Sequence, residues 1–475
     1  MRSKGWRSCT GQESGNWTDD TDDDYPFTYK FTYAVTDGKE KPAADSQDSA
    51  TLSDVSLPQG NAANSYNVTV SVYVTDAYGA ESDLSSDVAK GRPVVYSAAQ
   101  LAKISKALVE ALLAAGDSEG AMNVLAATHQ SLSSTSSRRR LLGSSSSNNT
   151  AAYVRNQMMS QLLTTYAYTD ISQSNVASLL STLEGILNTP NELSNATEVE
   201  ALSFLKAVTA ETVSSAIGMS ISGKSYAAAC LSYILETTLF SEYSPGRALK
   251  AAENVSTVLT HVSTALLYGS YSGEAYSMSA DNVHYRVMRE EKQYLDDVSI
   301  QVPGAESKVV LPTNITKGFG ASTLSSSDYV DTMVATLDKN MYGAISGSND
   351  TISSITSVSL QDENGDLISV SGLAAKKTAT QGPIEIVMES NTVFDLDFAS
   401  YELTKVCDIP SGVTNLTFEC PMYNISHICD PSLDPHMVTI MCPRKQPVCM
   451  FWDESSTAWA SGGCAVENYT STNVT

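Results

Sequence analysis

The residues with the clearest chemical meaning in this sequence are the cysteines near its C-terminal end. Of eight cysteines, Cys9 and Cys230 stand alone, whereas the others lie close together, at Cys407, Cys420, Cys429, Cys442, Cys449 and Cys464. Such a cluster either binds structural zinc or forms a disulfide framework. It contains no C-x-x-C pair, which zinc sites commonly supply. The spacing therefore favours disulfides and an extracytoplasmic protein.

The sequence offers little that could support catalysis. The five histidines show neither an H-E-x-x-H motif nor any paired spacing for a metal, and they are His129, His261, His284, His427 and His436. A nucleophile elbow, a Walker loop and a dinucleotide fingerprint are also missing from the sequence. We interpret each histidine as a surface or satisfied core residue, and we predict no enzyme activity, no catalytic residue, no metal site and no cofactor.

Two acidic stretches could bind calcium. The run DDTDDD at 19–24 has no fixed loop pattern, so a solvated turn is the preferred interpretation. The stretch Asp362–Asp366 reads D-x-N-x-D, but Leu373 stands at the twelfth position, where a calcium loop needs Glu. Asn364-Gly365 between alternating residues is a hairpin signal, so we predict a turn. Calcium stays a candidate cofactor only because the chain is acidic.

Asparagine sequons support a secreted protein. Their number is roughly twice what chance gives in a chain so rich in Ser and Thr. We expect glycans on most of them, above all on Asn415 and Asn424, which lie in predicted exposed hairpins. The sequons are Asn16, Asn67, Asn148, Asn195, Asn254, Asn314, Asn349, Asn415, Asn424, Asn468 and Asn473.

Net charge and hydropathy limit the classes of partner that the chain can bind and the ways in which it can associate with a membrane. A net charge of −24 and a pI near 4.5 argue against nucleic acid and anionic membrane surfaces, and they leave calcium or basic partners. The most apolar segment, 227–240, is too short to span a bilayer and contains Glu236. The N-terminus lacks the apolar stretch of a signal peptide, so we expect the chain to be a piece of a longer secreted protein.

The hydrophobic period divides the chain into three regions, as expected for a multidomain α+β protein. Residues 1–95 alternate with period two, as in PFTYKFTYAV (26–35), and predict a β-sandwich. Residues 96–274 contain six or seven stripes of helical period and predict an all-α block in which Pro190 ends one helix and Pro245-Gly246 forms a turn. Residues 275–475 return to strands and predict a second β-sandwich.

A low-complexity segment interrupts the helical region. It spans about 133–150, and its basic triplet is Arg138, Arg139 and Arg140. One interpretation is an exposed processing site for a secretory-pathway protease, and the other is a disordered loop in which the triplet has no function. In either case we expect this segment to be the first place that a protease cuts.

The last cysteines are spaced around two tryptophans. The order Cys449, Trp452, Trp459, Cys464 resembles the first half of the proteolysis-site (GPS) motif that closes the GAIN domain of adhesion receptors and polycystin-1-like proteins. Two tryptophans seven residues apart could fill a small sandwich core while flanking cysteines staple its strands. The alternative is an unrelated disulfide-stapled β-module.

The resemblance extends to the domain order. The first region, with NWTDDTDDDYPFTYKF and VYVTDAYGA, resembles the last sandwich of a receptor-for-egg-jelly (REJ) region, which is fibronectin-like. The helical block and the second sandwich then correspond to GAIN subdomains A and B. The family motif reserves its first two cysteines for a later Cys-x-Cys, which implies that Cys407, Cys420, Cys429 and Cys442 pair among themselves. Three pairings are open.

The family cuts itself by an N-to-O acyl shift at a Thr or Ser after His-Leu. No residue of this chain matches that part of the motif, and Thr475 is a sequon residue rather than the nucleophile. The resemblance thus implies self-cleavage only in a longer protein.

Two functions follow from the resemblance. The first is a non-catalytic juxtamembrane region of a polycystin-like receptor or channel subunit, on the extracellular side of the plasma or ciliary membrane. It would serve adhesion, ligand or mechanical sensing and would shield a tethered segment. Its partners would be extracellular proteins, matrix or glycans, its own membrane-anchored C-terminal region and a polycystin-2-like channel subunit. The second is a structural glycoprotein of a cell-surface or ciliary filament.

Overall fold

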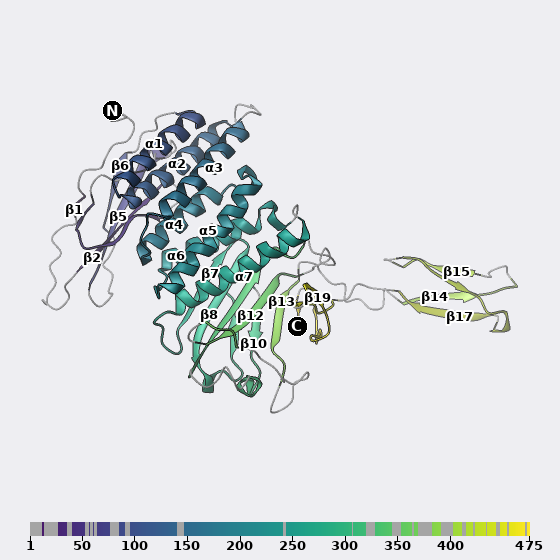
Figure 1. Ribbon diagram of the computed structural model, residues 1–475. Helices are drawn as coiled ribbons and strands as arrows, with labels where there is room; N and C mark the ends of the chain where they lie inside the picture. Colours follow the sequence, from purple (N-terminus) through teal and green to yellow (C-terminus); the bar gives the residue numbers. More distant parts are fainter. Residues whose placement is uncertain are drawn as a thin grey trace.

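The structure is a computed structural model, and it shows strands, then a helical block, then further strands (Figure 1). This order confirms the predicted α+β fold class. The structure describes residues 12–475 apart from 14–26, 36–39, 53–56, 58–59, 61–63, 77–84, 91–95, 140–146, 241–243, 306, 320–327, 344–352, 363–364, 369–381, 391–401, 411–414, 421–422, 434, 443–446, 454–455 and 471–472. Cys9, Asn16, Asn349 and the acidic run at 19–24 lie outside the described residues.

The N-terminal region contains strands β1 (Gln12–Glu13), β2 (Thr28–Ala34), β3 (Glu40–Gln47), β4 (Thr51–Leu52), β5 (Asn67–Thr75) and β6 (Ser85–Lys90). The sequence predicted a sandwich, whereas the described residues give one four-stranded antiparallel sheet in the order β3-β2-β5-β6 and a short β1-β4 ribbon. Alternation places Phe31, Tyr33, Val68 and Val72 in one buried cluster.

The opposite face of this sheet is polar. It surrounds the carboxylate of Glu40, which accepts hydrogen bonds from Thr32 Oγ1 (3.0 Å), Ser71 Oγ (3.2 Å) and the Tyr73 hydroxyl (2.6 Å). The sheet also contacts the helices, because the Tyr226 hydroxyl donates to the Glu40 carbonyl (3.1 Å) and the Asn123 amide donates to the Ala43 carbonyl (3.2 Å). The N-terminal sheet is therefore joined to the helical block.

The helical block contains α1 (Ala98–Ala114), α2 (Ser118–Arg139), α3 (Ser147–Tyr166), α4 (Gln173–Leu187), α5 (Asn195–Ser214), α6 (Ile221–Leu235) and α7 (Pro245–Leu267). Serine residues begin most of these helices: the hydroxyls of Ser97, Ser172, Ser194 and Ser220 each accept a backbone N–H of the first turn. Pro245 occupies the first turn of α7 and does not form the separate turn that the sequence predicted.

The low-complexity segment differs from the prediction. Helix α2 continues through Arg138 to Arg139, and α3 already begins at Ser147, so both ends of the predicted loop at 133–150 are helical. The run at 133–139 contains neither Gly nor Pro, so nothing in it ends a helix that its first four turns have already nucleated. Arg140 lies outside the described residues.

The C-terminal region contains two larger sheets. The first has the order β12-β11-β8-β7 and the second the order β20-β13-β10-β9. Their strands are β7 (Ala275–Ala280), β8 (Val283–Glu291), β9 (Ser299–Gln301), β10 (Lys308–Val310), β11 (Tyr329–Leu337), β12 (Ile355–Gln361), β13 (Glu385–Glu389) and β20 (Asn473–Val474). They are separate from the N-terminal sheet, as predicted.

Strand β11 lies in the middle of three layers. Its residues Met333, Ala335 and Leu337 belong to the core that contains the helices, whereas Val330 and Val334 belong to the core between the two sheets. Because successive side chains of a strand point to opposite faces, both faces of the β11 sheet are buried. Helices, first sheet and second sheet therefore stack in that order.

A third part lies apart from this body (Figure 1). It consists of two antiparallel ribbons, β14 (Glu402–Cys407) with β17 (His436–Met441), and β15 (Asn415–Phe418) with β16 (Ile425–Ile428). Disulfides join Cys407 to Cys429 and Cys420 to Cys442. We call this part the disulfide module. The sequence placed these residues inside the second sandwich, but they form a core of their own.

Candidate functional site

The four residues of the sequence motif come together in one hairpin. Strands β18 (Phe451–Asp453) and β19 (Ala458–Ala460) pair so that Trp452 lies opposite Trp459. Ser456 Oγ donates to the Asp453 carboxylate (2.8 Å) across the turn, and Thr457 takes a left-handed conformation with φ of 49°. A cross-strand pair of this kind places both indoles on the same face of the hairpin.

Both indoles pack on one tyrosine. The ring of Trp452 stacks on Tyr342 with centroids 4.4 Å apart and an interplanar angle of 18°. Trp459 meets the same ring edge-on at 5.6 Å, and the two indoles are themselves edge-to-face at 5.9 Å. Offset and edge-to-face contacts of this type stabilise a pair beyond the burial of its area. We call these three residues the aromatic clamp.

The aromatic clamp lies at the junction of helices and sheet. Tyr342 follows β11 in a turn in which its backbone N–H donates to Asn340 Oδ1 (2.9 Å), and it belongs to the core that the helices share with that sheet. The sequence predicted that the tryptophans would fill the sandwich core. Instead, both pack against the core that the helices share with the first sheet, because the anchoring tyrosine lies at that junction.

The cysteines that flank the hairpin bond to each other. The structure joins Cys449 to Cys464, with their Cα atoms 5.7 Å apart. This differs from the implied pairing, in which both were reserved for a later Cys-x-Cys. The reason is geometric, since the hairpin between them brings its two ends within disulfide range.

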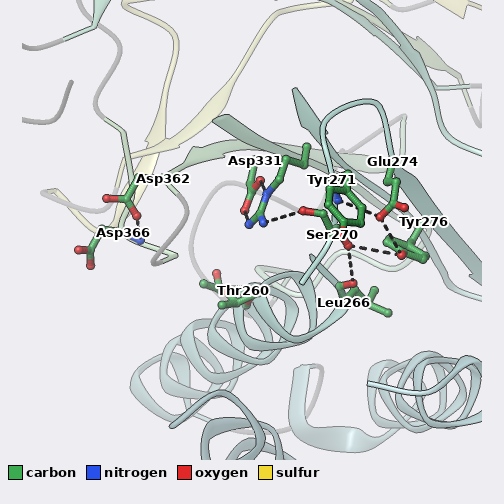
Figure 2. Close-up of polar contacts among 11 residues, drawn as sticks. Thr260, Leu266, Ser270, Tyr271, Glu274, Tyr276, Asp331, Asp362 and Asp366 are labelled. Atoms are coloured by element: carbon green, nitrogen blue, oxygen red, sulfur yellow. Dashed lines mark hydrogen bonds and ion pairs between the residues drawn. The ribbon is translucent and has the colours of Figure 1, made fainter. Parts of the chain in front are cut away.

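A buried ion pair joins the segment that follows the last helix to the first sheet. Arg289 on β8 donates from Nε and Nη2 to the two carboxylate oxygens of Asp331 on β11, both at 2.8 Å, and its Nη1 donates to the Ser270 carbonyl (3.2 Å). Asp331 and Ser270 lie near the end of α7 in Figure 2. The guanidinium thus fastens the segment after α7 to the sheet.

Several polar residues on the segment that follows α7 bond to one another. Figure 2 shows Tyr271, Glu274 and Tyr276 close together after α7. The Tyr271 backbone N–H (3.1 Å) and the Tyr276 hydroxyl (3.4 Å) both donate to the Glu274 carboxylate, and the Ser270 hydroxyl donates to Tyr276 (3.4 Å). These bonds fix the turn between the helical block and β7.

The candidate calcium stretch is a turn. The Asp362 backbone N–H donates to the Asp366 carbonyl (2.9 Å), and the Gly365 N–H donates to the Asp362 carbonyl (3.0 Å). Just outside this turn, Gln361 and Leu367 form an antiparallel β-bridge. Gly365 has φ of 85°, and a Cβ there would lie 2.8 Å from Thr264 Oγ1 on α7. Glycine is thus required both by the turn and by the helix behind it.

Three of the five histidines hold the fold together. His129 contacts Arg155 and Asn188 in the helical block, and His284 contacts Ser279 and Asp338. His261 on α7 contacts Thr209, and burial together with the charge of Lys206 lowers its pKa. The other two, His427 and His436, lie together beside Cys407. Sequence spacing gave no sign of that proximity.

The predicted modification sites differ in exposure. Asn195, Asn415, Asn424 and Asn468 are exposed, whereas Asn67, Asn254, Asn314 and Asn473 are partly buried. Asn148 lies in the first turn of α3, and its side chain is outside the described part of the chain. Cys230 is buried in α6 and donates to the Leu180 carbonyl (3.5 Å). In the described part of the chain, no helix is long and apolar enough to cross a membrane.

Comparison with known proteins gave one match by sequence. The family model for the REJ domain matches residues 9–127, and no curated protein matches the chain. Among solved structures, the full extracellular region of zebrafish Gpr126/Adgrg6 is similar, with 14% sequence identity and a TM-score of 0.36. The match covers 65% of this chain and 34% of that one, so the chain spans about a third of its length. Residues 9–127, from the N-terminal sheet into α2, are therefore similar to the REJ domain.

Proposed function

We propose that this chain is the non-catalytic extracellular juxtamembrane region of a polycystin-like receptor or channel subunit. The REJ-like residues 9–127 support the polycystin side of this proposal. The GAIN side is supported by the order Cys449, Trp452, Trp459, Cys464 and by the helical block that precedes the sandwich. In this proposal the chain reaches the plasma or ciliary membrane through the secretory pathway.

The observation that carries the role is the docking of the C-terminal hairpin on the junction. Trp452 and Trp459 pack on Tyr342, which belongs to the core that the helices share with the first sheet. The chain after this hairpin reaches β20, which pairs with β13, so the aromatic clamp and this pairing together would hold a downstream segment against the body. Force or ligand binding on the helical block could then reach that segment through the clamp.

The N-terminal sheet supplies the other end of this connection. Its contacts with Asn123 and Tyr226 tie it to the helices, and Arg289 ties the helices to the first sheet. A matrix protein or glycan bound to the REJ-like region would therefore pull on a continuous series of packed parts. A polycystin-2-like channel subunit and the protein's own membrane-anchored region are the proposed receivers.

The test uses the longer natural protein expressed in mammalian cells, with an epitope placed after residue 475. We expect surface labelling of the REJ-like region without permeabilisation, and membrane spans in the downstream sequence. We also expect Trp452→Ala to increase access of an antibody to the downstream epitope, with Phe451→Ala as the matched control. Intracellular retention of a well-folded chain, or unchanged access, would count against the proposal.

A structural glycoprotein of a filament is the second candidate. One observation favours it: the outer face of β14 and β17 exposes Val406, Met437 and Met441, with 52, 73 and 58% of their surfaces accessible. A ribbon with apolar residues on its outer face suits lateral association of copies. Downstream repeats in place of membrane spans, together with self-association that Met437→Lys abolishes, would favour this candidate over the first.

A further inference from the structure

The disulfide module brings two histidines together from different ribbons. His436 begins β17 and pairs with Cys407 on β14, and His427 on β16 pairs with Leu416 on β15. A ring nitrogen of each histidine and Cys407 Sγ all lie within 4.8 Å of one another. Both histidines are only partly exposed, so the rings lie between the ribbons.

One ring nitrogen in this group lacks a partner. The Nδ1 atom of His436 is buried and makes no hydrogen bond to any residue that the structure describes. A buried polar nitrogen without a partner costs free energy, which a ligand would recover. A metal ion meets this requirement, because neutral imidazole is a common ligand for transition metals.

The nearby Cys407 sulfur would not coordinate the ion as a thiolate. Cys407 is bonded to Cys429, so its sulfur is not the thiolate that zinc prefers. The two imidazole rings are therefore the ligands that the chain itself supplies.

We propose that His427 and His436 form a two-imidazole binding site for a divalent transition-metal ion, Zn²⁺ or Cu²⁺, between the ribbons of the disulfide module. Tetrahedral zinc holds two ring nitrogens about 3.3 Å apart at Zn–N distances of about 2.0 Å, and the two ring nitrogens here lie within 4.8 Å of each other. Water or a group from a partner completes the coordination. The two disulfides hold the ribbons together, so the site exists before the ion binds.

The test is metal binding by the complete secreted chain without a polyhistidine tag. Metal-stripped protein is titrated separately with Zn²⁺ and Cu²⁺ by calorimetry, after a thiol assay has shown the disulfides intact. We expect one equivalent to bind, at least tenfold weaker binding for His427→Gln or His436→Gln, and none at this site in the double variant. His261→Gln removes a histidine of the helical block and should leave binding unchanged.

A second measurement needs no variant. Diethyl pyrocarbonate modifies accessible histidines, and peptide mass spectrometry locates the modified ones. Zn²⁺ should protect His427 and His436 in the wild-type chain and leave His261 as reactive as before. The proposal is wrong if the chain takes up no ion, if uptake is independent of both histidines, or if binding appears only after a thiol has reduced Cys407–Cys429.

Discussion

Tyr342 is the residue on which the C-terminal hairpin depends. It receives the face of Trp452 and the edge of Trp459, and only 8% of its own surface is exposed. The two tryptophans contact each other as well, so loss of any one ring removes two of the three contacts. Single substitutions here should therefore loosen the whole hairpin.

Trp452→Ala should destabilise the docked hairpin by about 2 to 3 kcal/mol, because it removes a large apolar surface and the stacked contact. Hydrogen exchange of residues 448–466, followed by mass spectrometry, measures the effect. Phe451→Ala is the matched control, since Phe451 points to the opposite face and is 41% exposed. Equal effects of the two substitutions would contradict the role of the clamp.

His261 should make stability depend on pH. Burial, and then Lys206, lowers its pKa in the folded state from the ordinary value of 6.5. The folded protein thus binds fewer protons than the unfolded chain, so the stabilisation is complete above about pH 6.5 and is lost as the pH falls towards the folded pKa. In urea unfolding at pH 7 and pH 5, His261→Gln should lose less stability on acidification than the wild type. An unchanged difference would refute this assignment.

At the scale of elements, the pair of Arg289 and Asp331 connects α7, β8 and β11. The side chains are 13 and 5% exposed, so removing one partner would leave the opposite charge largely buried without it. Exposed pairs are different: Lys106 and Glu110 on α1, at 3.7 Å, remain largely in solvent. Burial decides which of the two pairs matters for the fold.

Asp331→Ala should lower the free energy of unfolding by about 3 to 5 kcal/mol, because it removes the carboxylate that pairs with the buried guanidinium of Arg289. Glu110→Ala, the exposed control, should cost less than about 1 kcal/mol. Denaturant unfolding of both variants measures the difference. The double variant Arg289→Met with Asp331→Leu should recover most of the loss, whereas further loss would mean that the pair does more than compensate charge.

The elements show what the sequence can and cannot predict. Alternation from Val68 to Val74 predicts β5, and Ser97, Ser172 and Ser194 cap the helices that their stripes predict, because these signals are local. Tyr342 as the anchor of Trp452 could not be predicted, since their contact forms only when the sheet packs on the helices. The approach of His427 to His436 depends in the same way on two ribbons joined by disulfides.

The whole molecule consists of a packed body and a separate module. The helices share one core with the first sheet and the two sheets share another, whereas the disulfide module has its own small core around Leu416 and Phe418. Parts that share a core unfold together, and a part with its own core unfolds independently. The N-terminal sheet also has a cluster of its own, but its hydrogen bonds to Asn123 and Tyr226 join it to the helices. We therefore expect two transitions, one of the body and one of the disulfide module.

Removing the Cys407–Cys429 bond in the variant Cys407→Ser with Cys429→Ser should destabilise the module by about 3 kcal/mol, as expected for a loop of this length. The separation of the two residues is 22. Hydrogen exchange should rise within 402–442 and remain unchanged in α4–α7. The control variant Cys449→Ser with Cys464→Ser should leave the module unaffected. Loosening of the helices in the first variant would show that the module is not independent.

Glycans should follow exposure in the folded chain. Asn415 and Asn424 on the module are exposed, whereas the Asn254 amide oxygen accepts a hydrogen bond from Lys206 Nζ (2.8 Å) and that of Asn473 is buried. A glycan on either of the last two would have to displace packed neighbours. Peptide mapping with and without glycosidase should find the module sites occupied and those two bare, and the reverse pattern would contradict the predicted surface.

The geometry of the aromatic clamp also has an optical consequence. Two indoles held edge-to-face at 5.9 Å couple their electronic transitions, and a tyrosine stacked at 4.4 Å lies within range for energy transfer to indole. Undocking would separate Tyr342 from both indoles and restore its emission, whereas the exciton couplet in the circular dichroism spectrum would persist for as long as the hairpin stays paired. The protein therefore carries an intrinsic chromophore that reports, without any attached label, whether its C-terminal hairpin is docked.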